Sequence, residues 1–344
     1  MSASLASSAP ADIEFVPERL DQHLRQALPG LEGPMRLARI GGGQSNPTFF
    51  VDFDSRALVL RKQPPGVLLP SAHAVDREYR VLRALAGSAV PVPPTVLYCD
   101  DRAVIGTPFY VMEKLEGRVL SNYALPGVAP AERRAYYFAM AETLARLHAV
   151  DWAAAGLADY GRPGNFFQRQ IARWTRQWEA SRTRADANIE RLIEWLPANI
   201  PPGDQTTIAH GDFRFGNLMF HPTEPRVIAV LDWELSTLGH PLADVAYNCM
   251  AWHTGADEFE GMRGIDLAAE GIPTQAEYVA HYRQAGGCAE PMTNFHMAFS
   301  LFRFAVILEG IATRAKSGSA AAKDAQQVGA QAAGFARRAA ALIS

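Results

Sequence analysis

Short runs of alternating apolar and polar residues dominate the first part of the chain, as is typical of β-strands. The pattern predicts strands at residues 35–40, 48–53 and 57–61. Glycines 41–43 interrupt the chain after the first run, and Asp54-Ser55 follows the second. Both breaks favour turns, so each predicts a tight connection between neighbouring strands.

Helical spacing flanks these runs. Apolar residues recur every three or four positions at residues 17–28 and 75–86, where we predict helices. Three prolines between residues 91 and 94 indicate an extended linker, and two more strands are predicted near residues 103–105 and 109–114. The first part of the chain is therefore expected to be rich in strands.

The rest of the chain is predicted to be mainly helical. Helices are expected at residues 131–150, 168–180, 188–196 and from residue 242 to the end, with a loop at residues 316–320. Short strands are expected at residues 208–209, 218–220 and 227–231. The change in pattern places a boundary near residues 116–117.

Composition narrows the class of protein. The chain has 344 residues, which favours two packed domains. Its formal net charge of −3 gives no electrostatic reason to expect nucleic acid or an anionic membrane as a partner. Cys99, Cys249 and Cys288 lie far apart, without zinc-ligand spacing. We find no signal-peptide pattern and no apolar run near the ~20 residues of a membrane helix, so we expect a cytoplasmic protein.

The segment from His210 to Asn217 holds the first candidate for chemistry. A kinase catalytic loop needs an aspartate that orients the attacking hydroxyl and accepts its proton, and an asparagine five residues later that holds a metal ion. Asp212 and Asn217 have this spacing, and Arg214 lies where a cation reaches a transferring phosphoryl group. The spacing alone is weakly specific, and a polar turn between two strands is the alternative.

A second carboxylate follows the predicted strand at residues 227–231. Asp232 lies at the end of that strand, where kinase-type sites carry the second metal ligand. Mg²⁺ needs few protein ligands beside phosphate oxygens and water, so Asp232 and Asn217 suffice. Glu234 is either a further metal or substrate contact or, as we expect, a solvated turn residue.

The glycine-rich turn before the second predicted strand is a candidate phosphate-binding loop. Gly42 and Gly43 allow backbone N–H groups to approach a phosphate closely, and Ser45 and Asn46 follow them. A hairpin turn without a ligand is the alternative. The chain contains no G-x-x-x-x-G-K-[ST] motif, which disfavours a P-loop enzyme.

The third predicted strand offers a cation to the α- and β-phosphates. Strand alternation places Arg61 and Lys62 on opposite faces, and we favour Arg61 because a guanidinium holds phosphate bidentately. Glu78, on the helix at residues 75–86, is the expected ion-pair partner. Surface charge on an edge strand and a helix face is the alternative for all three.

The strand at residues 109–114 ends near the predicted boundary. Backbone groups of Glu113 and Leu115 are candidates for hydrogen bonds to adenine, with the Met112 side chain behind the ring. A plain core strand is the alternative.

The order and spacing of these segments resembles the aminoglycoside phosphotransferase-like family, from about residue 37 to residue 308. The likeness is strongest to the subgroup related to the kinase-like domain fused to acyl-CoA dehydrogenases. It rests on residues 42–46, 68–73, 77–80, 210–212, 216–218 and 231–234. His240 departs from the family pattern, which often has Asp at this position, and Asp244 matches a family aspartate that braces the catalytic loop.

The resemblance implies an α+β, protein-kinase-like fold of two lobes. Residues 1–30 would form an N-terminal arm and helix, residues 31–116 a nucleotide-binding lobe with a five-stranded antiparallel sheet, and residues 117–344 a mainly helical lobe with a helical insert at about 151–200. ATP with Mg²⁺ would lie between the lobes. The resemblance does not distinguish ATP from GTP as the preferred nucleotide, or a monomer from a dimer.

The acceptor is predicted from the composition of the insert, which mixes arginines and aromatic residues with few acids. These residues are Arg162, Arg169, Arg173, Arg176, Arg182, Arg184, Tyr160, Phe166, Phe167, Trp174 and Trp178. A polycationic aminoglycoside should meet carboxylates instead, so we expect a small-molecule hydroxyl substrate that is anionic and partly apolar, such as a hydroxyacyl-CoA or hydroxy acid. The alternatives are an antibiotic kinase and a nucleotide-binding pseudokinase or scaffold, and core packing with a solvated arginine face is the plainer explanation for most of these side chains.

Overall fold

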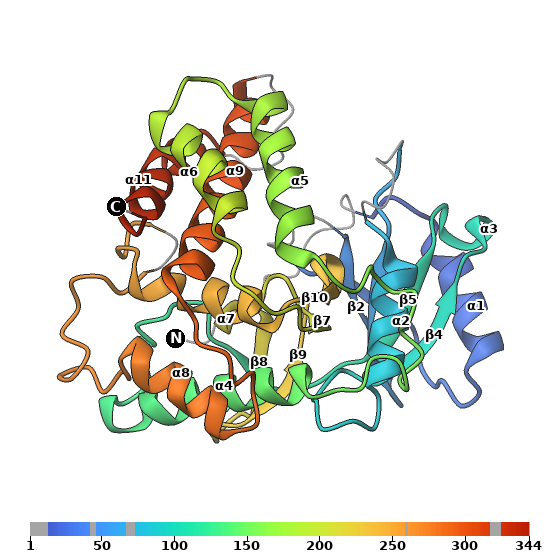
Figure 1. The fold of residues 1–344 in the computed structure, drawn as a ribbon. Helices are drawn as coiled ribbons and strands as arrows, with labels where there is room; N and C mark the ends of the chain where they lie inside the picture. Colours follow the sequence, from blue (N-terminus) through green and yellow to red (C-terminus); the bar gives the residue numbers. More distant parts are fainter. Residues whose placement is uncertain (1–12, 42–45, 67–72, 259–260, 317–324, 344) are drawn as a thin grey trace. The chain divides into compact units, whose positions relative to one another are not determined.

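The computed structural model describes residues 13–41, 46–66, 73–258, 261–316 and 325–343. The chain folds into two compact units (Figure 1). The first comprises Met1–Gly117 together with Ala229–Glu234, and the second comprises Arg118–Ile228 together with Leu235–Ser344. A short segment from the second half of the sequence, which carries Asp232, thus belongs to the first unit.

An antiparallel sheet of five strands forms the centre of the first unit, as predicted. Its strands run in the order β1-β2-β3-β5-β4. Their bounds are β1 Arg36–Arg39, β2 Thr48–Asp52, β3 Ala57–Lys62, β4 Thr95–Cys99 and β5 Phe109–Glu113. β3 therefore lies in the middle of the sheet, and Arg61 pairs in register with Tyr110 of β5.

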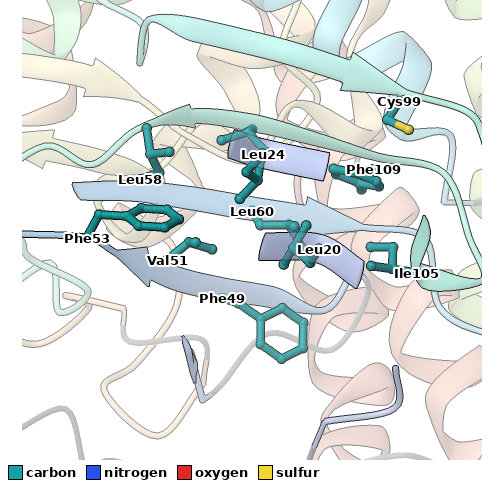
Figure 2. Close-up of a cluster of buried hydrophobic side chains, with 11 residues drawn as sticks. Leu20, Leu24, Phe49, Val51, Phe53, Leu58, Leu60, Cys99, Ile105 and Phe109 are labelled. Carbon is teal, nitrogen blue, oxygen red and sulfur yellow. The ribbon is translucent and has the colours of Figure 1, made fainter. Parts of the chain in front are cut away.

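Helices cover the two faces of this sheet. Helix α1 (Pro17–Ala27) supplies Leu20 and Leu24 to an apolar cluster with residues from β2, β3 and β5 (Figure 2). Helix α2 (Val75–Leu85) packs against β4 and β5. Successive side chains of β3 alternate between the faces, so Leu60 joins the cluster whereas Arg61 meets Glu78 of α2.

One predicted strand of the first unit is wrong. The run near residues 103–105 is a short helix, α3 (Arg102–Ile105), because the Asp101 side chain accepts a hydrogen bond from Ala103 N at 2.8 Å and Gly106 ends the turn at φ 83°. The fifth strand of the sheet is instead β4, which begins at Thr95, directly after the prolines that suggested a linker. Because β4 pairs with β5, the count of five strands still holds.

The described part of the second unit is mainly helical. Its helices are α4 Pro130–His148, α5 Phe166–Ser181, α6 Ala187–Ala198, α7 Pro241–Cys249, α8 Gln275–Gln284, α9 Asn294–Lys316, α10 Ala325–Ala330 and α11 Ala332–Ala341. Its strands are β6 Arg118–Val119, β7 Thr207–Ala209, β8 Leu218–Phe220 and β10 Thr237–Gly239. They are arranged as the pair β10-β7 and the sheet β6-β8-β9, in which the first two residues of β9 (Val227–Val230) belong to the second unit and the last two to the first. The sequence missed β6 and β10, because β6 has only two residues and β10, with the sequence TLG, lacks the apolar run that marks β7 and β8.

Helix α9 corrects one expectation about apolar runs. The stretch Asn294–Ala315 has a mean hydropathy of 1.5 and is long and apolar enough to cross a membrane by length and composition. Of its most apolar window, 78% is buried inside the protein, and α5, α7 and α11 pack against the helix. Burial of this kind is typical of the core helix of a globular fold.

Candidate active site

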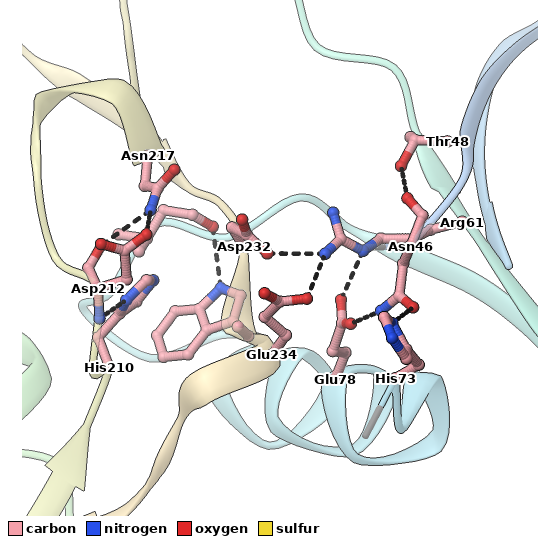
Figure 3. Close-up of polar contacts among 12 residues, drawn as sticks. Asn46, Thr48, Arg61, His73, Glu78, His210, Asp212, Asn217, Asp232 and Glu234 are labelled. Carbon is pink, nitrogen blue, oxygen red and sulfur yellow. Dashed lines mark hydrogen bonds and ion pairs between the residues drawn. The ribbon is translucent and has the colours of Figure 1, made fainter. Parts of the chain in front are cut away.

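The loop after β7 brings Asp212 and Asn217 together in the second unit. Asn217, at the end of a 3₁₀ turn (Phe215–Asn217), donates from Nδ2 to Asp212 Oδ2 at 2.7 Å and to the Asp212 backbone oxygen at 2.8 Å (Figure 3). The amide therefore fixes the Asp212 carboxylate. Asn217 Oδ1 has no polar partner among the described residues and is left as an oxygen ligand.

Two further side chains contact the Asp212 carboxylate. The Tyr247 hydroxyl, on α7, donates to Asp212 Oδ1, and Arg214 Nε lies 3.3 Å from the same oxygen. Burial and then the charge of Asp212 raise the pKa of Tyr247 well above its usual value, so its hydroxyl keeps the proton that it donates. Tyr247 was not singled out from the sequence, because its contact with Asp212 depends on the packing of α7 against a loop 35 residues away.

Arg214 folds back over Asp212. A Cβ at Gly216 would lie 2.5 Å from Arg214 Nη1, so the glycine leaves room for the guanidinium. Burial alone would lower the pKa of Arg214, but the neighbouring Asp212 carboxylate raises it above the usual value. In the structure, this cation neutralises Asp212 rather than pointing away from it.

Asp244 holds the backbone of the loop that carries Asp212. Its two carboxylate oxygens accept hydrogen bonds from His210 N at 2.6 Å and Gly211 N at 2.9 Å. Gly211 adopts φ 84°, and a Cβ there would lie 2.7 Å from Leu235 O, so glycine is required. His148 contacts Asp244 at 3.4 Å and the Tyr282 hydroxyl at 2.7 Å, as a structural side chain would.

In the first unit, Asp232 follows the end of β9 in a strained backbone conformation. Its φ of 62° is uncommon for a residue with a side chain and is often found at functional sites. Arg61 Nη2 donates to Asp232 Oδ1 at 2.7 Å (Figure 3), which leaves Oδ2 without a polar partner among the described residues. Trp233 is buried and donates to Val230 O at 3.0 Å, which anchors the turn.

Three carboxylates surround the Arg61 guanidinium. Glu78 Oε2 lies 2.8 Å from Arg61 Nε, Asp232 Oδ1 lies 2.7 Å from Nη2, and Glu234 Oε2 lies 3.7 Å from Nη2. One cation cannot neutralise three anions. Burial, opposed by Arg61 but reinforced by Asp232 and Glu234, raises the pKa of Glu78 to about 7. Burial lowers and the three carboxylates raise the pKa of Arg61, which ends above its usual value.

The neighbours of this cluster agree with the choice of Arg61 over Lys62 and change the interpretation of Glu234 and Asn46. Lys62 lies on the other face of β3, buried, with Nζ 3.6 Å from Glu14, so it does not join Arg61 and Glu78. Glu234 is three-quarters buried against Arg61 instead of being a solvated turn residue. The Asn46 side chain donates to Glu78 Oε1 at 2.5 Å and contacts His73 at 3.1 Å, so its polar atoms support Glu78. Tyr110, which the sequence did not single out, donates to Glu78 Oε2 at 3.1 Å.

The chemistry of the donor set fits Mg²⁺. No group of three or more His, Cys, Asp or Glu side chains in the described part of the chain can hold a metal by itself. Mg²⁺ instead prefers one or two carboxylates with phosphate oxygens and water. Asp232 Oδ2 in the first unit and Asn217 Oδ1 in the second are each a hard oxygen donor of this kind. Within the first unit, the surplus of carboxylates around Arg61 favours a second cation.

The end of β5 has free backbone groups. Glu113 N donates to Pro94 O at 2.8 Å, so of its two backbone groups only the carbonyl remains for adenine. Leu115 N has no hydrogen-bond partner among the described residues. Met112, one position earlier, is half-buried. The candidate phosphate-loop residues Gly42, Gly43 and Ser45 lie outside the described residues.

Comparison with known proteins identifies relatives over most of the chain. The model of the phosphotransferase enzyme family matches residues 36–291. The chain is 47% identical to acyl-CoA dehydrogenase family member 10 of Mus musculus over 301 residues, which is 86% of this chain and 28% of that protein. It is 42% identical to acyl-CoA dehydrogenase family member 11 of Rattus norvegicus over 313 residues, 89% of this chain and 40% of that protein. The chain thus spans less than half the length of these relatives.

Solved structures share the fold. A Ralstonia eutropha protein, provisionally assigned as an aminoglycoside phosphotransferase, is 46% identical with a TM-score of 0.87, and the match covers 95% of this chain and 98% of that one. Aminoglycoside phosphotransferase APH(4)-Ia, solved as a ternary complex with AMP-PNP and hygromycin B, is 17% identical with a TM-score of 0.61, covering 93% of this chain and 98% of that one. At that identity the likeness concerns the fold alone.

Proposed function

The chain belongs to the phosphotransferase enzyme family, and from this premise we propose that it transfers the γ-phosphoryl group of ATP to a hydroxyl of a small molecule. The observation that carries the proposal is the Asp212 carboxylate, fixed by the Asn217 amide at 2.7 Å on a loop that Asp244 braces. A carboxylate positioned in this way can orient an acceptor hydroxyl and accept its proton.

The remaining groups have separate roles in this proposal. Asn217 and Asp232 are the proposed Mg²⁺ ligands, and the ion, when bound, would offset the negative charge of the phosphates. Arg61 contacts phosphate, held in place by Glu78. Arg214 moves from Asp212 to the transferred group. The Glu113 carbonyl and Leu115 N–H receive adenine.

We propose a hydroxyacyl-CoA or hydroxy acid as the acceptor in preference to an aminoglycoside. This choice is supported by the names of two relatives, acyl-CoA dehydrogenase family members 10 and 11, which refer to acyl-CoA chemistry. The insert at residues 151–200 also holds seven arginines and six acidic residues, so it lacks the surplus of carboxylates that a polycationic acceptor would require. An aminoglycoside kinase is the second candidate, favoured by the name of the Ralstonia eutropha relative.

The test is a transfer assay with the full chain. Mg²⁺-ATP is combined with hydroxyacyl-CoAs, the free hydroxy acids and kanamycin-type aminoglycosides, and ADP release and acceptor phosphorylation are followed by a coupled assay and mass spectrometry. We expect turnover of acyl acceptors that is lost in Asp212→Asn. Thermal stabilisation by Mg²⁺-ATP without turnover on any acceptor would favour the nucleotide-binding scaffold, and turnover of aminoglycosides alone would favour the antibiotic kinase.

A further inference from the structure

A group of cationic and aromatic side chains gathers beside Asp212 in the second unit. It comprises Arg173 and Trp174 on α5, Tyr247 on α7 and Arg303 on α9. Helix α9 packs against both α5 and α7 (Figure 1), which brings the three elements together. The roles proposed above leave the two arginines and the tryptophan unused.

Arg303 ties this group to the catalytic loop. Its Nη2 donates to Gly211 O at 2.8 Å, the carbonyl directly before Asp212. Its guanidinium carbon lies 5.6 Å from the centre of the Tyr247 ring, whose hydroxyl donates to Asp212. Arg303 therefore contacts two neighbours of Asp212, the Gly211 carbonyl and the Tyr247 ring, and its positive charge lies close to the carboxylate that would receive the acceptor hydroxyl.

Trp174 lies between the two arginines. Its ring centre is 5.7 Å from the guanidinium carbon of Arg303 and 5.2 Å from that of Arg173. The indole Nε1 is buried and has no hydrogen-bond partner in the described part of the chain. A buried N–H without an acceptor is rare and destabilising, so it indicates a missing partner.

The positive charges of the group lack counter-ions. Neither Arg173 nor Arg303 forms an ion pair with any described residue, whereas Arg184, also on the insert, is held by Glu309 and Asp186. Solvent reaches the Arg173 side chain, yet desolvation and then the like charge of Arg303 lower its pKa. Two guanidinium groups without a counter-ion thus converge on one buried indole N–H that lacks an acceptor.

We propose that Arg173, Trp174 and Arg303 bind an anionic group of the acceptor, a carboxylate or a phosphate, and so determine its specificity. Arginine forks match the oxygens of both anions, and an indole N–H adds a third donor. This inference rests on the proposed phosphotransferase function. The geometry disfavours polycationic acceptors, since they would meet two like charges beside Asp212.

The test uses acceptors that differ only in charge. A hydroxy acid is compared with its neutral amide, and a hydroxyacyl-CoA with the hydroxyacyl-pantetheine that lacks the nucleotide phosphates, which separates a carboxylate from a CoA phosphate as the bound group. The variants are Arg173→Met and, as the matched control, Arg176→Met, because Arg176 is exposed on the same helix and contacts no described ion or ring. Trp174→Phe keeps the ring and removes the N–H.

We expect kcat/KM for the preferred anionic acceptor to fall about 10- to 100-fold in Arg173→Met, the range for a charge-assisted hydrogen bond, and to change little in Arg176→Met or for neutral acceptors. Trp174→Phe should reduce the same preference. Equal turnover of charged and neutral acceptors, or equal loss in the two arginine variants, would overturn the anion site while the phosphotransferase function stands.

Calorimetric binding of the acceptors without ATP separates the two proposals. If no acceptor is phosphorylated but anion binding falls in Arg173→Met and not in Arg176→Met, the anion site stands and the phosphotransferase function fails. If calorimetry shows that the anionic acceptors bind no more tightly than the neutral ones, and the kinetic assay shows no preference for them either, the anion site is overturned.

Discussion

Arg61 Nη2 lies 2.7 Å from Asp232 Oδ1, although the two residues are 171 positions apart in the chain. The contact joins the central strand of the sheet to the turn after β9, inside one compact unit. It gives the proposed metal ligand a protein cation as its partner. Since Glu78 and Glu234 also face this guanidinium, its charge is shared among more anions than it can neutralise.

Loss of the Arg61 guanidinium should weaken nucleotide binding. We expect Arg61→Ala to raise the KM for ATP about tenfold or more, the usual scale for a charge-assisted phosphate contact, and Arg61→Lys to recover only part of this because an ammonium cannot bind bidentately. Lys62→Met is the control, as Lys62 lies on the other face of β3. Steady-state kinetics over a range of ATP concentrations decides. A larger rise of the KM for ATP in Lys62→Met than in Arg61→Ala would make Lys62 the residue that contacts phosphate.

Removal of the Asp232 charge should uncouple nucleotide binding from the metal. Asp232→Asn suits this test, because asparagine tolerates the φ of 62°. We expect the added thermal stabilisation by Mg²⁺ over ATP alone to disappear, because the phosphates then lack a carboxylate-bound cation. Glu234→Gln should retain the effect. The reverse pattern would make Glu234 the metal ligand.

The sequence predicted those parts of the site that depend on short-range spacing. The five-residue step from Asp212 to Asn217 and the opposite faces of Arg61 and Lys62 follow from local geometry. Tyr247 could not be predicted, since its contact with Asp212 requires the packing of a helix against a distant loop.

The same limit applies to the fold. The long strands and helices have enough turns or alternations to be recognised, so most were predicted within a few residues of their bounds. Helix α3 was mistaken for a strand because its β-branched residues outweighed the Asp101 cap, and β10 is defined by its pairing with β7 alone. The periodicity of apolar residues contains no information on either effect, because strand pairing depends on the tertiary structure and a helix cap depends on a single residue.

Replacement of the proposed base should separate chemistry from binding. We expect Asp212→Asn to lower kcat about 10²- to 10⁴-fold, the usual contribution of general-base catalysis, with little change in the KM for ATP. Tyr247→Phe leaves the carboxylate but removes one donor, so its kcat should fall much less. Turnover of Asp212→Asn at the wild-type rate would refute the assignment.

His296 should make the stability of the second unit depend on pH. Burial and then the neighbouring His240 lower the pKa of His296 from 6.5 to about 4, and its Nδ1 accepts a hydrogen bond from Thr293 N at 3.1 Å. The unfolded chain therefore binds this proton more readily than the folded chain between pH 6.5 and 4. The free energy of unfolding should fall as the pH drops through this window, by up to about 3 kcal/mol for this group.

Denaturant unfolding of wild type and His296→Asn at several pH values between 7 and 4 tests this dependence. Asparagine can present an oxygen to Thr293 N in place of Nδ1 but takes up no proton. His240, whose pKa burial also lowers, stays in both proteins, so the difference between their slopes isolates His296. The variant should lose less stability than wild type as the pH falls from 6.5 to 4. Parallel curves would show that His296 is protonated as easily in the folded chain as in the unfolded one.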